Sequence, residues 1–225
     1  MNRILASCLL AAMTVVATAQ TGDDWASLGR YAEQNKTVAE LPQQQRRVVF
    51  MGNSITDSWA TMRPRFFSDN GYVGRGISGQ TTCQMVLRFA QDVIALHPQT
   101  VVINAGINDI AENTGPYDEE LTFGNIRLMA ETARHYNINV VLTSVLPAAG
   151  FRWNRAVSDA PEKIASLNRR IRAYAESQGL TYIDYHAAML APDGRSLNPR
   201  YTRDGVHPTD EGYAVMEDFY KNIQL

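Results

Sequence analysis

A serine, an aspartate and a histidine in this sequence have the types and placement needed for nucleophilic catalysis. Ser54 follows an apolar run at 48–51, and Asp204 and His207 lie three residues apart near the C-terminus. A serine hydroxyl is a weak nucleophile unless an imidazole takes its proton, and the imidazole needs a carboxylate that fixes its tautomer. The three residues therefore predict Ser54 as nucleophile, His207 as general base and Asp204 as the orienting acid.

Ser54 taken alone has a simpler explanation, because serine is common as the cap of a helix. Thr56 also replaces the second glycine of the Gly-x-Ser-x-Gly elbow found in the common α/β-hydrolases. The catalytic interpretation therefore depends on other parts of the chain that would meet Ser54.

The elements that would position these residues are short apolar runs separated by longer segments of helical period. The runs are at 48–51, 72–73, 101–104, 140–145 and 180–183, and helices are expected at 80–96, 117–136, 161–178 and 209–223. This alternation is typical of a parallel sheet with crossover helices. We expect a three-layer α/β/α sandwich around a five-stranded parallel sheet.

Ligands of such sheets bind beyond the carboxyl ends of the strands. Ser54 follows the first expected strand, Gly79 the second and Asn108 the third. A glycine lets its backbone amide approach a substrate oxygen, and an asparagine side chain can donate to the same oxygen. We therefore expect the amides of Ser54 and Gly79 and the side chain of Asn108 to form an oxyanion hole. A turn asparagine is the simpler explanation of Asn108.

A dinucleotide-binding loop is the alternative use of the glycines at 74, 76 and 79, which match Gly-x-Gly-x-x-Gly. That fingerprint requires an acid about 20 residues later, at the end of the next strand. Asp92 falls inside an expected helix, and the next strand ends in Asn104. The pattern therefore does not favour a nucleotide.

Other histidines and acids offer two further alternatives. His97, His135 and His186 have no paired spacing, so no metal site is predicted. Asp184 and His186 form the one competing acid and base pair, and we interpret Asp184 as structural.

The composition is that of one globular domain, with 225 residues, 45% hydrophobic residues and a formal net charge of −2. This charge gives no electrostatic reason to expect nucleic acid or an anionic membrane as partner. Residues 1–19 contain a basic Arg3, an apolar stretch and a small-residue site ending in Ala19, which is typical of a secretory signal. We expect a signal peptide at 1–19, a domain at 20–225, and export to the periplasm or the extracellular space without a stable membrane anchor.

The two cysteines are relevant to the expected export of the protein. Cys8 ends a short segment that looks like a lipoprotein cleavage box, but too few residues precede it to form an apolar region. Removal of 1–19 would leave Cys83 alone, so no intramolecular disulfide is expected.

Four ordered blocks of this chain resemble those of the SGNH (GDSL) hydrolase family. The blocks begin at Gly52, Gly76, Gly106 and Asp204 and end at Thr56, Thr82, Asp109 and Pro208. The resemblance implies a flavodoxin-like fold, no cofactor, and ester hydrolysis through an acyl-enzyme. It assigns the same triad and the same oxyanion donors. Asn53 stands where the family usually has aspartate, and Gly74-Arg75 stands where its second block usually opens with asparagine.

The substrate is the least determined part of the function. Exported members of the family often remove acetyl groups from sugars, so we expect a small-molecule or glycan ester. Arg152 and Trp153 follow the fourth strand and would suit a sugar at the rim, although a hydrophobic plug under a loop explains Trp153 equally well. The alternatives are a lysophospholipase or thioesterase of the same family, and a non-catalytic carbohydrate-binding protein.

Overall fold

The structure, a computed structural model, describes residues 24–221 and 223. A parallel sheet of five strands in the order β2-β1-β3-β4-β5 forms its centre. The strands are β1 (Val48–Gly52), β2 (Tyr72–Gly76), β3 (Thr100–Ile103), β4 (Asn139–Thr143) and β5 (Thr181–Ile183). The expected three-layer fold with five parallel strands is therefore confirmed.

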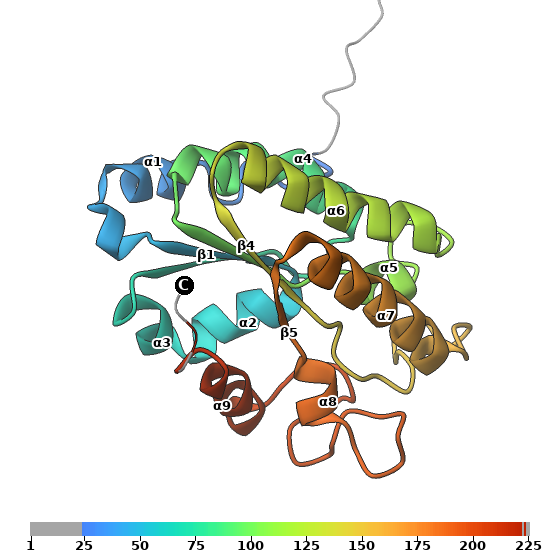
Figure 1. The fold of residues 1–225 in the computed structure, drawn as a ribbon. Coiled ribbons are helices and arrows are strands. Elements are labelled where there is room, and N and C mark those ends of the chain that lie inside the picture. Colours follow the sequence, from blue (N-terminus) through green and yellow to red (C-terminus); the bar gives the residue numbers. More distant parts are fainter. Residues whose placement is uncertain (1–23, 222, 224–225) are drawn as a thin grey trace, which may run out of the picture.

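Helices cover both faces of this sheet (Figure 1). On one face lie α1 (Ala32–Glu40), α4 (Thr82–Asp92), α6 (Glu119–His135) and α7 (Ala160–Gln178). On the other lie α2 (Ser54–Met62), α3 (Pro64–Ser68) and α9 (Asp210–Asp218). Shorter elements are η1 (Gln43–Gln45), η2 (Ile94–Leu96), α5 (Ile107–Ile110) and α8 (Tyr185–Met189).

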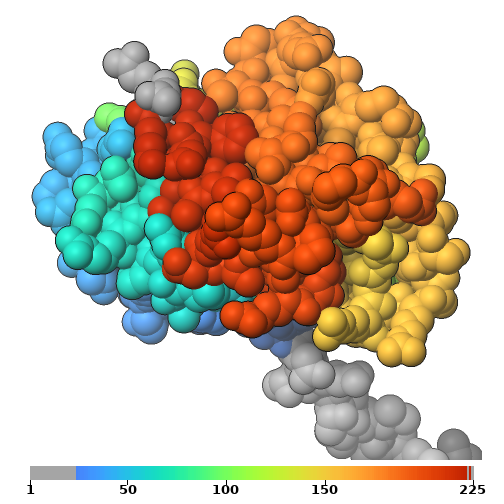
Figure 2. Space-filling model, turned by 90° about the horizontal axis from the view of Figure 1, so that it is seen from below, coloured from blue at the N-terminus to red at the C-terminus, as the bar shows by residue number. Residues whose placement is uncertain are grey.

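The central strands are apolar because both of their faces are covered. Every residue of β1 and β3 is buried, as expected for strands between two helical layers. Phe50 of β1 packs edge to face against Trp59 of α2, with ring centroids 5.5 Å apart. Trp59 in turn stacks on Tyr213 of α9 at 5.7 Å. The C-terminal helix is thereby part of the core, and Figure 2 shows the red C-terminal segment against the cyan segment that contains α2 and α3.

The expected helices and strands are present, but several end elsewhere. The second strand continues to Gly76, beyond the apolar pair at 72–73. The helix expected at 80–96 begins at Thr82 and ends at Asp92, followed by the separate turn η2. The helix expected at 209–223 ends at Asp218. The helix α1 was not predicted, because its sequence is mostly polar and buries only Asn35 and Val38.

The expected signal peptide at 1–19, including Cys8, lies outside the described residues. None of the helices in the described part of the chain has the length and apolar character needed to cross a membrane.

Candidate active site

Ser54, His207 and Asp204 come together in a continuous chain of hydrogen bonds. Ser54 Oγ lies 2.9 Å from His207 Nε2. His207 Nδ1 lies 2.7 Å from Asp204 Oδ2 on the other side of the ring. Both distances are those of good hydrogen bonds. If Nδ1 carries the proton and donates a hydrogen bond to the carboxylate, Nε2 is free to accept the proton of the serine hydroxyl.

A tight turn holds Asp204 against the imidazole. The second carboxylate oxygen, Oδ1, accepts the backbone N–H groups of Val206 at 2.9 Å and of His207 at 2.8 Å. Partial burial raises the pKa of Asp204, but the hydrogen bonds from the His207 ring and from these two amides outweigh burial and lower the pKa to about 2. Gly205, at φ +89°, allows the chain to turn so closely. The carboxylate is therefore charged at neutral pH.

Contacts of α9 fix the distance between this turn and the nucleophile. The helix begins three residues after His207, and the hydroxyl of Tyr213 donates to the carbonyl of Ile55 at 2.9 Å. At the other end of α2, Arg63 pairs with Asp210 at 2.8 Å and with Glu217 at 2.5 Å. The histidine therefore reaches Ser54 because α9 is docked on the helix that Ser54 begins.

The backbone amide of Ser54 lies at the N-terminus of α2, where the first N–H groups of a helix have no intrahelical acceptor. Asn53 caps this helix, because its side-chain oxygen accepts the N–H of Ile55 at 3.3 Å. The family's usual aspartate has an equivalent oxygen, so this departure keeps the cap. The helix dipole also favours negative charge at this end.

The other two expected oxyanion donors are Gly79, on the loop before α4, and Asn108, in the short helix α5. The Asn108 amide donates to the carbonyl of Gln80 at 2.9 Å, which ties the α5 turn to the residue after Gly79. Gly79 has φ +80°, and a Cβ there would meet no protein atom within 4 Å. The requirement for glycine thus comes from the backbone conformation, whereas protein neighbours impose no steric limit. Gly79 also lines a cavity that a substrate can occupy.

A buried arginine connects the nucleophile strand with the oxyanion loop. Arg88 donates to the carbonyl of Gly52 at 2.8 Å and to the side-chain oxygen of Gln80 at 2.6 Å. Its charge is balanced by Asp92 at 2.9 Å, and both side chains are 0% exposed. Burial lowers the pKa of Arg88, and the hydrogen bond to Asp92 opposes this shift. Sequence reasoning missed this role, because Arg and Asp four residues apart on a helix are ordinarily a solvent-exposed pair.

We expect Arg88→Met to be strongly destabilising, because it would leave the carboxylate of Asp92 buried without its partner. The loss should be about 3–5 kcal/mol in the free energy of unfolding. Urea denaturation at pH 7 measures it. Arg65→Met is the control, since Arg65 is 90% exposed and its ion pair with Asp69 should contribute at most about 1 kcal/mol. Equal effects of the two substitutions would contradict a special role for Arg88.

The glycines of the Gly-x-Gly-x-x-Gly pattern have other uses in this structure. Gly74 and Gly76 lie inside β2, and α2 packs directly on them. A Cβ on Gly76 would lie 2.1 Å from the backbone N of Asp57, and one on Gly74 would lie 2.7 Å from the Cβ of Ala60. These two glycines therefore bring β2 close to the helix of the nucleophile.

The competing acidic residues have structural partners. Asp184 caps α8 by accepting the N–H of Ala187 at 3.0 Å, and it also pairs with Arg172. Asp109 accepts the amide of Thr82 at 3.0 Å and its hydroxyl at 2.6 Å. Asp109 therefore fixes the start of α4. Within residues 24–221 and 223, no group of three His, Cys, Asp or Glu side chains is arranged to hold a metal ion.

The expected substrate-binding residues Trp153 and Arg152 have different surroundings. Trp153 is half-exposed, and its ring centroid lies 6.4 Å from that of His207. Its indole N–H donates to Asn113 Oδ1 at 2.9 Å, and Asn113 donates to the carbonyl of Gly79 at 3.0 Å. Arg152 donates to the carbonyl of Arg203 at 3.3 Å and so connects its loop to the turn that carries Asp204. Trp153 thus lies between the histidine and the oxyanion loop, whereas Arg152 connects two loops.

Comparisons with known proteins identify the family of this chain. A model of the GDSL-like lipase/acylhydrolase family matches residues 50–215. A GDSL-like lipase from Bacteroides thetaiotaomicron is 55% identical with a TM-score of 0.85, and the match covers 87% of this chain and 96% of that one. A Bacteroides fragilis protein described as an acylhydrolase is 54% identical with a TM-score of 0.86, covering 89% and 96%.

A more distant relative is an acetylxylan esterase from Xylanibacter ruminicola, which is 24% identical over 76% of this chain and 42% of its own length. The chain spans about two fifths of the length of the curated relatives it matches. The family model, by contrast, covers most of the chain, and the resemblance suggested by the four sequence blocks is confirmed. The chain belongs to the GDSL-like lipase/acylhydrolase family.

Proposed function

We propose that the protein is a serine esterase that works through an acyl-enzyme, with Ser54 as the nucleophile. The observation that carries the proposal is the hydrogen-bonded sequence from Ser54 Oγ through the His207 ring to Asp204. Family membership supports an ester hydrolase in general. The roles of individual residues and the substrate class belong to the proposal.

The reaction begins when His207 Nε2 accepts the proton of Ser54 as Oγ attacks the ester carbonyl. The imidazolium that forms is stabilised by the charged carboxylate of Asp204, 2.7 Å away. It then gives its proton to the leaving alcohol, and the acyl group remains on Ser54. A water molecule, deprotonated by the same imidazole, attacks this acyl-enzyme and regenerates the serine.

The negative charge that develops on the carbonyl oxygen needs fixed donors. We assign this role to the backbone N–H groups of Ser54 and Gly79 and to the side-chain amide of Asn108. No backbone carbonyl among the described residues accepts a hydrogen bond from the Gly79 amide. One hydrogen of the Asn108 side-chain amide is already used to hold Gln80. Donors positioned before the reaction stabilise the transition state without reorganisation.

Acetylated carbohydrates are the proposed substrates. The cavity beside Gly79 is lined largely by polar side chains, among them Ser78, Asn113 and Thr114, whereas a long acyl chain favours an apolar pocket. The distant acetylxylan esterase relative supports the same class. We also propose that residues 1–19 direct export to the periplasm or the extracellular space, where such polymers occur.

Short acyl esters should be preferred over long ones. The oxyanion hole is indifferent to acyl length, so any selectivity comes from the acyl pocket. We expect kcat/KM for p-nitrophenyl acetate to exceed that for the octanoate by at least about tenfold, a difference of about 1.4 kcal/mol. A panel from acetyl to octanoyl esters measures it, and a higher kcat/KM for octanoate would favour the lysophospholipase or thioesterase alternative.

A non-catalytic carbohydrate-binding protein is the alternative from another class. Such a protein would bind acetylated glycans but release no acetate from them. Acetate release from acetylated oligosaccharides, at a rate proportional to enzyme concentration, supports the esterase. Binding without release from any ester in the panel would support the binding protein.

A further inference from the structure

A groove with two exposed tryptophans adjoins the oxyanion loop. It has a volume of about 660 Å³, and its lining includes Ser78, Gly79, Trp25 and Trp153. Trp25 is 52% exposed and Trp153 is 49% exposed, whereas Trp59 is buried in the core. Two half-exposed indole rings that line one groove need an explanation, because tryptophan is usually well buried.

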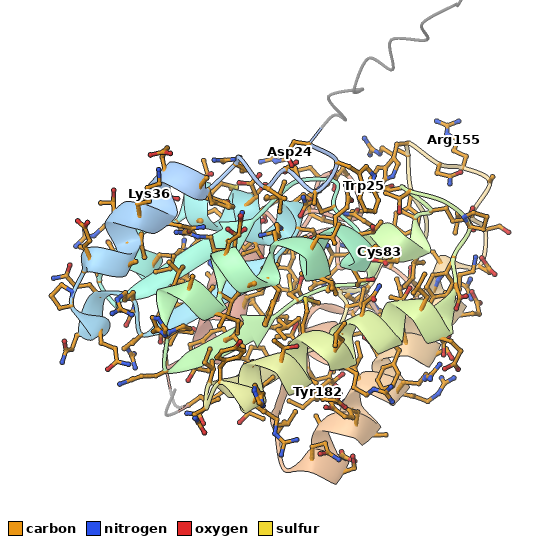
Figure 3. All side chains as sticks on the ribbon, turned by 90° about the horizontal axis from the view of Figure 1, so that it is seen from above. Asp24, Trp25, Lys36, Cys83, Arg155 and Tyr182 are labelled. Carbon is orange, nitrogen blue, oxygen red and sulfur yellow. The ribbon has the colours of Figure 1, made fainter. Side chains whose placement is uncertain are left out.

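Hydrogen bonds connect the segments of both tryptophans to the region around Gly79. The Trp153 ring is fixed through Asn113, which donates to the Gly79 carbonyl. The backbone around Trp25 is held by two glutamines of the same region, because Gln84 donates to the carbonyl of Trp25 at 2.6 Å and Gln80 to that of Ala26 at 2.7 Å. Figure 3 shows Trp25 on the same side of the molecule as Arg155, which belongs to the loop of Trp153. The Trp153 ring and the backbone of Trp25 are therefore both tied to the region around Gly79.

The rest of the groove lining is mostly polar and almost uncharged. Among the described residues that line it, Glu112 is the only charged one, and it faces Lys163 at 3.6 Å. This composition does not suit a lipid, which needs a continuous apolar surface, or a nucleic acid, which needs basic residues. It suits a neutral sugar, because the C–H faces of a pyranose pack on indole rings while its hydroxyls exchange hydrogen bonds with serine, threonine and asparagine side chains.

We propose that this groove binds the sugar units next to the acylated one, with Trp25 and Trp153 as stacking platforms. The ligand is a neutral oligosaccharide chain that extends from the ester on the Gly79 side. The inference rests on the proposed esterase function and adds to it a preference for oligomers over monosaccharide esters. Trp25 carries the sharper test, because Trp153 also lies beside His207.

The experiment compares acetylated methyl glycosides with acetylated tetrasaccharides of the xylo, cello and manno series. For the wild-type protein we expect kcat/KM, per acetyl group, to be at least about tenfold higher for the tetrasaccharide in one series, mainly through a lower KM. Trp25→Ala should reduce this advantage about tenfold, the typical effect of truncating a stacked tryptophan in an interface. Trp25→Tyr should restore part of it, since a second flat ring replaces the first.

Leu28→Ala is the matched control, because Leu28 is 41% exposed in the same segment but does not line the groove. It should leave the advantage unchanged. The inference is overturned if the wild-type protein hydrolyses p-nitrophenyl acetate but shows no advantage for any tetrasaccharide, or if Trp25→Ala keeps the full advantage. Absence of turnover on p-nitrophenyl acetate as well would instead mean that the proposed function itself has failed.

Discussion

Ser54→Ala is expected to abolish ester hydrolysis, with a loss of about 10⁶ in kcat, the magnitude seen when a serine triad loses its nucleophile. Removal of Oγ leaves His207 Nε2 without the hydroxyl 2.9 Å away and leaves no atom on which the acyl group can be carried. The oxyanion donors would remain, because Gly79 and Asn108 are held by other loops. Initial rates on p-nitrophenyl acetate measure the effect.

The fold should survive this substitution, because the side chain that caps α2 is that of Asn53 and not that of Ser54. Thermal melts of the two proteins should therefore nearly coincide. Ser177→Ala, an exposed serine on α7, is the control and should retain full activity. Substantial turnover by pure Ser54→Ala protein would show that another residue is the nucleophile.

Asp204→Asn is expected to lower kcat by up to about 10⁴ with little change in KM. The asparagine oxygen can still accept the backbone amides of Val206 and His207, so the turn should keep its shape. The NH₂ group would then face His207 Nδ1, and this nitrogen would have to accept a hydrogen bond instead of donating one. The proton would move to Nε2, which could no longer accept the proton of Ser54.

Asp184→Asn is the matched comparison, because it makes the same chemical change in the other candidate acid. Asparagine is also a good helix cap, so the start of α8 should be kept and only the pairing with Arg172 weakened. We expect normal kcat and a change of at most about 1 kcal/mol in stability. A large loss of kcat in Asp184→Asn with normal activity in Asp204→Asn would mean that the orienting acid has been misassigned.

The features that could be predicted from sequence are those with local signals. Strands buried between two helical layers have short apolar runs in their sequence, and such runs predicted all five strands. The helix expected at 161–178 was close to the observed α7, because Pro161 lies in its first turn and Gly179 ends it at φ +64°. Asp204 and His207 were found because one tight turn holds both. Their approach to Ser54 depends on α9 and could be inferred only from the order of the blocks.

The features that could not be predicted depend on contacts between distant segments. Arg88 resembles a surface arginine in sequence, and only the packing of α4 on the ends of β1 and β2 buries it. Gly74 matched a nucleotide-loop pattern that the sequence did not favour, and the structure places it within β2, where α2 leaves no room for a Cβ. Trp25 could not be assigned a role from sequence, because it follows closely on the expected signal peptide. Its link to the region of Gly79 depends on hydrogen bonds from the distant Gln84 to Trp25 and from Gln80 to Ala26.

Labelling with a fluorophosphonate, followed by peptide mass spectrometry, tests the central claim most directly. This reagent reacts with a serine only when a general base activates it and an oxyanion hole receives the phosphonyl oxygen. The account predicts one adduct, on Ser54, that is lost in Ser54→Ala and strongly slowed in Asp204→Asn. An adduct on a different residue, or an active esterase that the reagent neither labels nor inhibits, would contradict it.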